Sequence, residues 1–279
     1  MSRPPATPAG LAALLPDEPR WVDLGGMLRS GRCDVFHGDD PAGGFVARSW
    51  DFAFAAAAGQ PEPGVVHRAV AGRSGEGTAW AREGSAGEWH LLANEESVEA
   101  IGRALPGWRR RGVVLHSRPP GAGRPESPEP AAGVDLLLAP DGWVAAGLDL
   151  DHLPPELRRE YRTEHVRACP LAAAVTGGRA VAFCYAPYRT ETLWDVAVDT
   201  LPDHRRRGLA TACFRTLAAH LAGRGLEAVW GALAENEPSL RMAARLGFRP
   251  VARLTSFVAP KGWSHTHDTM DLLRASISC

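Results

Sequence analysis

A basic surplus is the first thing that this sequence lacks. Its 31 lysine and arginine residues, of which Lys261 is the only lysine, are balanced by 32 acidic residues, and the net charge is −1 at pH 7. A protein that binds nucleic acid needs an excess of positive charge to neutralise phosphates, so no nucleic-acid partner is expected. The excess of arginine over lysine, beside abundant Ala, Gly and Pro, is typical of codon bias and carries no functional weight by itself.

Paired cysteines, a leader segment and a membrane span are lacking as well. The five cysteines contain no C-x-x-C pair, so a disulfide framework is not expected and a reducing compartment is favoured. The chain does not begin with a charged-then-apolar pattern, and no apolar run reaches the length of a membrane span. We therefore expect a cytoplasmic protein with no membrane partner.

A metal-ligand cluster is also not evident. Ten histidines are scattered along the chain, and the pair in His265-Thr266-His267 has no third ligand nearby in sequence. Zinc sites take three or four protein ligands, so no metal is expected. The apolar content of 45% and the charged content of 23% are those of a globular protein.

One stretch that is present stands out, Arg205-Arg206-Arg207-Gly208-Leu209-Ala210, between a strand-like segment at 193–198 and an amphipathic helix at 211–222. The order strand, basic glycine turn and helix predicts an anion-binding cradle, because the first-turn N–H groups and the positive end of the helix dipole point at the turn. Arginines add fork-like donors for phosphate oxygens. A capped loop without a ligand is the alternative. The turn lacks the Lys-Ser/Thr ending of a P-loop and the three glycines of a dinucleotide fingerprint.

Proline density marks a boundary in the chain. Residues 118–133 are rich in proline and glycine. Proline can neither donate to a sheet nor continue a helix, so a semi-extended linker is predicted there. The expected organisation is an N-terminal α/β domain at 1–117, the linker at 118–133 and a second domain at 134–279.

The N-terminal domain shows one clear pattern. A strand at 89–93, a helix at 95–105 capped by Asn94 and a strand at 113–116 predict a strand–helix–strand crossover. Three further segments are short and mixed, and no order is predicted for them: 34–37, 52–58 and 65–71.

The second domain reads as several strands around two helices. Pro155 opens a helix that Pro170 ends, and Gly177-Gly178 joins the two strands of a hairpin. Cys213 lies on the apolar stripe of the helix at 211–222, which predicts packing and not a nucleophile. The strands expected here span 134–138, 143–148, 171–175, 180–185, 193–198, 227–233, 251–258 and 269–273.

The basic turn has the form Arg-x-x-Gly-x-Ala, and it is followed by the strand at 227–233, by Asn236-Glu237-Pro238-Ser239 and by Leu246-Gly247-Phe248. Together these segments resemble the GNAT family of N-acetyltransferases, over about residues 134–258. The resemblance implies an α/β (α+β) fold of GNAT type, with a mixed, mostly antiparallel sheet flanked by helices, preceded here by a smaller α/β domain. One interpretation of the smaller domain is a degenerate GNAT-like copy. It has Asn94-Glu95-Glu96 where the other half has arginines, so one acetyl-CoA site per chain is expected.

The same resemblance implies acetyl-CoA as co-substrate, with its diphosphate on the basic turn. Its pantetheine arm would lie along residues 196–198 like an added peptide strand, provided that this strand splays from the strand at 227–233. Core packing is the alternative reading for the valine side chains, and both readings can hold together. The cofactor-binding residues expected are Val196, Ala197, Val198, Arg205, Arg206, Arg207, Gly208, Leu209, Ala210, Thr211, Asn236 and Ser239.

Candidates for the base that deprotonates the amine are Asp195 and Glu191, acting directly or through a water. The alternative is that Asp195 pairs with an arginine and Glu191 is solvated. The tyrosine that many GNAT relatives use as general acid falls at Ala243, which cannot donate a proton; a water could protonate the thiolate instead. The other donors considered are Tyr185, Tyr188 and Ser239, of which Tyr188 joins the two carboxylates as a catalytic candidate.

The predicted function is transfer of an acetyl group from acetyl-CoA to the primary amine of a small molecule. Two alternatives stay open: a non-catalytic acyl-CoA-binding or sensing protein of the same fold, and a protein or peptide N-acetyltransferase. Fold and motif do not identify the acceptor. The oligomeric state is not fixed by the sequence, and a homodimer is one option.

Overall fold

The computed structural model describes residues 7–71, 88–119 and 132–260. Its contacts group the chain into two units, one of residues 1–114, 233–235 and 252–279, the other of residues 115–232 and 236–251. The predicted linker lies almost entirely outside the described residues, as do the strand expected at 269–273 and the His265/His267 pair. The domain boundary therefore stays a prediction.

The first unit is built on a sheet whose strands follow the order β1-β2-β3-β4-β12-β5. The first three strands are antiparallel, and β3 pairs with β4 in parallel. Apolar side chains from helices α3 and α4 and from the sheet form its core, with Val66, Leu91 and Ile101 fully enclosed. The elements are α1 (Pro8–Ala12), α2 (Val22–Ser30), β1 (Cys33–His37), β2 (Gly44–Ser49), β3 (Phe54–Gly59), α3 (Pro63–Ala71), β4 (His90–Ala93), α4 (Val98–Ala104), β5 (Arg109–Ser117) and β12 (Arg249–Val258).

The predicted crossover in this unit is present with two differences. The helix starts with a 3-10 turn at Glu95–Ser97 before α4, and β12 lies between β4 and β5 in the sheet. The segment 65–71 forms α3, which connects the parallel pair β3 and β4. Strand β3, helix α3 and strand β4 follow the same strand–turn–helix–strand order as the segment around residues 205–210. In the first unit, the turn equivalent to the basic turn is therefore at residues 60–62, and not at Asn94-Glu95-Glu96 as predicted.

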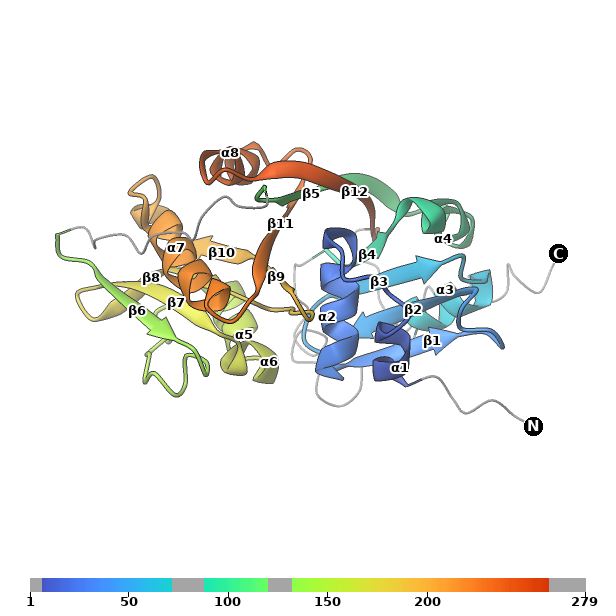
Figure 1. The fold of residues 1–279 in the computed structure, drawn as a ribbon, viewed down its shortest axis with the longest axis horizontal. Coiled ribbons are helices and arrows are strands. Elements are labelled where there is room, and N and C mark those ends of the chain that lie inside the picture. Colours follow the sequence, from blue (N-terminus) through green and yellow to red (C-terminus); the bar gives the residue numbers. More distant parts are fainter. Residues whose placement is uncertain (1–6, 72–87, 120–131, 261–279) are drawn as a thin grey trace. The chain divides into compact units, whose positions relative to one another are not determined.

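The second unit holds an antiparallel sheet of four strands in the order β10-β8-β7-β6. A short parallel pair, β9 with β11, forms beside it. Helix α7 packs across one face of the four-stranded sheet (Figure 1). The elements are β6 (Asp135–Ala139), α5 (Pro155–Tyr161), α6 (Glu164–Ala168), β7 (Leu171–Thr176), β8 (Arg179–Tyr185), β9 (Leu193–Asp195), β10 (Ala197–Thr200), α7 (Leu209–Ala222), β11 (Glu227–Leu233) and α8 (Glu237–Arg245).

Aromatic side chains hold α7 in place. The Phe214 ring, on α7, lies 6.0 Å from the Trp194 ring, 5.7 Å from Trp230 and 5.6 Å from Phe248, measured between ring centroids. All four are buried, and Cys213 is buried beside them, as its apolar stripe predicted. The helix that follows the basic turn is therefore held by a closely packed apolar core.

Two predictions for the second unit were wrong in detail. Residues 143–148 form turns and not a strand, because Gly142 and Gly147 take left-handed φ angles of 93° and 68° that reverse the chain. The helix expected from Pro155 is broken into α5 and α6, since the Thr163 hydroxyl accepts from the Val166 N–H and caps a new helix. The hairpin with its Gly177-Gly178 turn is confirmed. The mixed, mostly antiparallel fold with flanking helices is confirmed as well.

Candidate functional site

Residues 193–198, predicted as one strand, change partners at Val196. Up to Asp195 the chain pairs in parallel with β11, and the Val196 N–H still donates to the Val229 carbonyl at 3.0 Å. From Ala197 on, it pairs antiparallel with β8. Strands β10 and β11 therefore diverge from this point (Figure 1).

The divergence leaves one edge of β10 without a neighbouring strand among the described residues. Backbone groups alternate in direction along a strand. The Val196 N–H points toward β11 and the Leu201 N–H donates to the Val181 carbonyl of β8 at 2.9 Å, so the Val198 N–H and C=O point to the open edge. An extended chain with amide groups can pair there as an added strand.

The basic turn continues directly from this strand. Arg206 and Gly208 take left-handed φ angles of 61° and 77°, and Gly208 is the N-cap residue of α7. Arg206 is the one described non-glycine residue with a positive φ. Left-handed residues turn successive N–H groups to one side, and the N–H groups of Leu209, Ala210 and Thr211 have no acceptor within the first helical turn. The turn thus presents a concave set of donors.

The arginine side chains of the turn are exposed. The Arg205 Nε donates to the Thr200 carbonyl at 3.2 Å, which fixes the entry of the turn. An Arg207 guanidinium nitrogen donates to the His204 Nδ1 at 3.2 Å. Three fixed positive charges around inward-facing N–H groups favour a polyanionic ligand.

Asn236 and Ser239, predicted as cofactor-binding residues, have structural partners. The Asn236 Oδ1 accepts from the Ser239 N–H at 3.3 Å and caps α8. The Ser239 hydroxyl accepts from the Trp230 Nε1 at 2.9 Å, which ties α8 to β11. Their side chains thus fix the helix beside β11, and their cofactor contacts stay a prediction.

The sequence and the fold both resemble known proteins. Residues 172–257 match the family model described as GNAT acetyltransferase. The resemblance to the GNAT family is confirmed. The match includes the strand that changes partners, the basic turn, α7 and α8. The match to this family supports an acyltransferase activity in general terms.

Solved structures share the fold over most of the chain. A GCN5-related N-acetyltransferase-like protein from Streptococcus suis has a TM-score of 0.60 at 19% identity, over 90% of this chain and 96% of its own. A putative GNAT-family acetyltransferase from Novosphingobium aromaticivorans has 0.52 at 24% identity, over 87% and 96%. A tandem GNAT protein from the clavulanic acid biosynthesis pathway, solved without AcCoA, has 0.53 at 16% identity, over 94% and 97%. The last likeness is consistent with two GNAT-like halves. No curated protein matches the sequence significantly.

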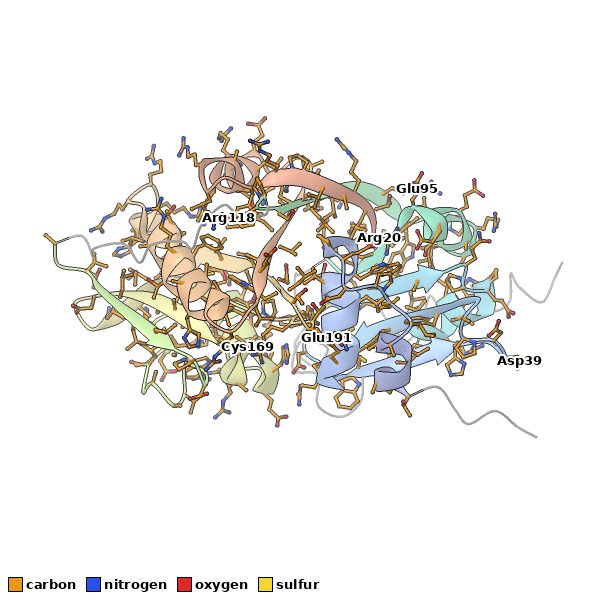
Figure 2. The ribbon with its side chains drawn as sticks, viewed as in Figure 1. Arg20, Asp39, Glu95, Arg118, Cys169 and Glu191 are labelled. Atoms are coloured by element: carbon orange, nitrogen blue, oxygen red, sulfur yellow. The ribbon has the colours of Figure 1, made fainter. Side chains whose placement is uncertain are left out.

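The predicted catalytic residues lie at the start of the site. The Asp195 N–H donates to the Tyr188 carbonyl at 2.9 Å, so these two residues are joined through their backbones. The Tyr188 side chain is buried, with its ring 5.6 Å from His165. Glu191 is exposed on the loop that leads into β9 (Figure 2). Ala243 is fully buried in the core, so its methyl group fills space and donates nothing.

A pair of carboxyl groups was missed from the sequence. Asp199 on β10 accepts from the Tyr161 hydroxyl at 3.1 Å, and Glu160 on α5 accepts from the Tyr185 hydroxyl. Val198 packs on the α7 side of the sheet, so by alternation Asp199 lies on the opposite face. Asp199 continues the alternation that begins at Asp195, a pattern visible in the sequence, but Glu160 is 39 positions away along the chain and no local signal links the two.

The environment of this carboxyl pair disfavours charge. Burial and, to a lesser extent, the neighbouring Asp199 carboxylate raise the pKa of Glu160 to about 7, against the lowering effect of the hydrogen bond from Tyr185. Burial also raises the pKa of Asp199, which the Tyr161 hydrogen bond and the Arg205 charge oppose. Both side chains remain partly exposed, so solvent or a ligand can reach them.

The described residues contain neither a metal-ligand cluster nor a membrane-spanning helix. Within residues 7–71, 88–119 and 132–260, no group of three or more His, Cys, Asp or Glu side chains could hold a metal ion. In the same part of the chain, no helix is both long and apolar enough to cross a membrane.

Proposed function

We propose that this protein transfers an acetyl group from acetyl-CoA to the primary amine of a small molecule. The observation that carries the proposal is the change of partner at Val196, which opens the edge of β10 beside a basic turn at the start of α7. The open edge of β10 suits an amide chain, and the basic turn suits a diphosphate. Acetyl-CoA has both parts, joined in that order.

The binding roles follow from position. The N–H groups of residues 208–211 and the arginine side chains would hold the diphosphate. The Val198 N–H and C=O, which point to the open edge of β10, would pair with the pantetheine amides or, through the N–H, polarise the thioester carbonyl and stabilise the oxyanion. Leu209 is buried, so it would contribute through its backbone.

The chemical class of the acceptor is inferred from the acidic side chains near the open strand edge. Asp195 and Asp199 alternate onto one face of the strand, and Glu160 joins them from α5. An acidic surface beside the thioester favours a cationic acceptor, which at neutral pH means an amine. A small molecule is preferred because these acidic groups are partly buried.

One specific observation favours a second candidate, a protein that binds or senses acyl-CoA without turnover. Ala243 occupies the position of the tyrosine that many GNAT relatives use as general acid, and it is fully buried. A thiolate is a tolerable leaving group near neutral pH, so its loss does not exclude catalysis. Enzyme assays must therefore decide between the two.

The test joins binding to turnover. Titration calorimetry with acetyl-CoA measures affinity, and a thiol-release assay measures transfer to polyamines, aminoglycosides, amino acids and peptides. We expect micromolar or tighter binding and thiol release with at least one small primary amine. Binding without release for any acceptor would favour the sensor, release with peptides alone would favour a peptide acetyltransferase, and absence of acetyl-CoA binding would refute the proposal.

A further inference from the structure

Two tyrosine–carboxyl pairs meet on the face of the sheet that α7 does not cover. Glu160 and Tyr161 are neighbours on α5, and each is joined to a different strand, Glu160 to Tyr185 of β8 and Tyr161 to Asp199 of β10. The two phenol rings lie 5.4 Å apart in an edge-to-face arrangement. Each carboxyl group is thus held by a phenol.

The position of these groups relates them to the open strand edge. Tyr185 stands directly opposite Ala197 in the register of β8 and β10, and Ala197 is the first residue after the change of partner. Asp199 lies two residues farther along β10, about 7 Å at the rise of a strand. The carboxyl groups therefore lie beside the stretch of β10 assigned to the thioester and pantetheine.

The groups that face this pair are known from each packed element. Tyr185 of β8 acts on Glu160, and Tyr161 of α5 and Arg205 of the turn act on Asp199, while the two carboxyl groups act on each other. The Arg205 guanidinium is the single cation acting on Asp199 among these groups. Two carboxyl groups in one half-buried site do not both ionise readily, so the pair keeps one proton up to near neutral pH.

We propose that Glu160 and Asp199 together form the proton-accepting group for the acceptor amine, an inference that rests on the proposed acetyl transfer. The pair takes one proton from the ammonium group R–NH3+, which gives R–NH2. The nitrogen lone pair then forms a C–N bond at the thioester carbonyl, and the C–S bond breaks with its electron pair going to sulfur. The second nitrogen proton goes to that thiolate, and the pair releases its proton to solvent.

This assignment differs from the candidates that sequence alone offered. Glu191 is exposed, so water screens its charge. Glu160 is oriented by the phenol of Tyr185 and half-buried, and burial raises its pKa to about 7, which suits a base that works at neutral pH. The pair thus combines position with suitable basicity.

The experiment compares pH profiles of kcat for four variants of the full chain, with acetyl-CoA and the best amine of the thiol-release panel. In the wild type, kcat should rise near pH 7 as Glu160 loses its proton, which gives the profile a limb at that pH. Glu160→Gln should lower kcat at least about 100-fold at pH 8 and abolish this limb. Asp199→Asn should move that limb to lower pH, because a neighbouring negative charge is removed. Tyr185→Phe should move it to higher pH, because a hydrogen bond to the carboxylate is lost. The amine titrates alike in every variant.

Glu156→Gln is the matched control, since Glu156 is exposed in the first turn of the same helix and should keep both rate and profile. All variants should bind acetyl-CoA within about threefold of the wild type. The opposite shifts of Asp199→Asn and Tyr185→Phe test the inference even if Glu160→Gln fails to fold. Unmoved limbs in both variants, or an equal loss at every pH in Glu160→Gln, would overturn it while leaving acetyl transfer intact. A wild type that binds acetyl-CoA without any turnover would overturn the proposed function itself, and the proton role with it.

Discussion

Replacement of Gly208 by valine tests the basic turn most directly. Gly208 has a φ of 77° and precedes α7 as its N-cap. A Cβ placed there would meet nothing within 4 Å, so the substitution creates no clash inside the protein. Its cost is backbone strain, about 1–3 kcal/mol for a side chain held in the left-handed region. Valine, which is β-branched, belongs at the upper end.

The strain has a consequence for binding. If the backbone relaxes toward negative φ, the N–H groups of the first helical turn no longer converge; if it does not relax, two methyl groups stand where the diphosphate would lie. We expect the Kd for acetyl-CoA to rise at least tenfold, about 1.4 kcal/mol. Titration calorimetry measures the Kd, and urea unfolding measures the free energy of unfolding.

Gly225 supplies a matched control at the other end of α7. Its φ is 79°, and a Cβ there also meets nothing within 4 Å. Gly225→Val should therefore lower the free energy of unfolding by a similar amount and leave the acetyl-CoA affinity unchanged. The reasoning is refuted if folded Gly208→Val binds acetyl-CoA as the wild type does, or if the two variants lose affinity equally.

Three further predictions concern the base, the number of sites and pH-dependent stability. Asp195→Asn should keep the wild-type shape of the pH–kcat profile if Glu160 and Asp199 accept the proton, whereas a loss that shrinks as pH rises would identify Asp195 as the base. Calorimetry should give one acetyl-CoA site per chain, because β3 of the first unit pairs with β2 and β4 on both edges over residues 55–57 and its Gly59 carbonyl, beyond the pairing with β4, accepts from the Ser97 hydroxyl at 2.6 Å; two comparable sites would contradict this. Since burial raises the pKa of Glu160 from 4.5 to about 7, its stabilising contribution is full below pH 4.5 and is lost as pH rises to about 7, a change of up to about 3 kcal/mol. Urea unfolding at pH 5 and pH 8 should therefore show a smaller difference for Glu160→Gln than for the wild type, and equal differences would contradict the assigned pKa.

Local chemistry explains what could be predicted from the sequence. The turn at 205–210 is identified by glycine, arginine and the apolar period of the following helix, all within one stretch of chain. The hairpin at Gly177-Gly178 is equally local, because both glycines supply the positive φ angles that its turn needs. The strand predicted at 143–148 was wrong for an equally local reason. Gly142 and Gly147 take positive φ angles and turn an apolar segment that has the composition of a strand.

Tertiary pairing decided the rest. No residue between 193 and 200 signals that the strand changes neighbours, because whether β10 pairs with β8 or β11 depends on where those distant strands lie. Glu160 became part of the candidate site only because α5 packs its tyrosine and its carboxylate over two strands far along the chain. The sequence by itself determined a basic glycine turn before a helix, since the conformations of a few consecutive residues are enough to form one. The tertiary structure decided where an acyl chain could lie and which carboxyl groups would share a proton, since strand pairing and burial depend on residues distant in sequence.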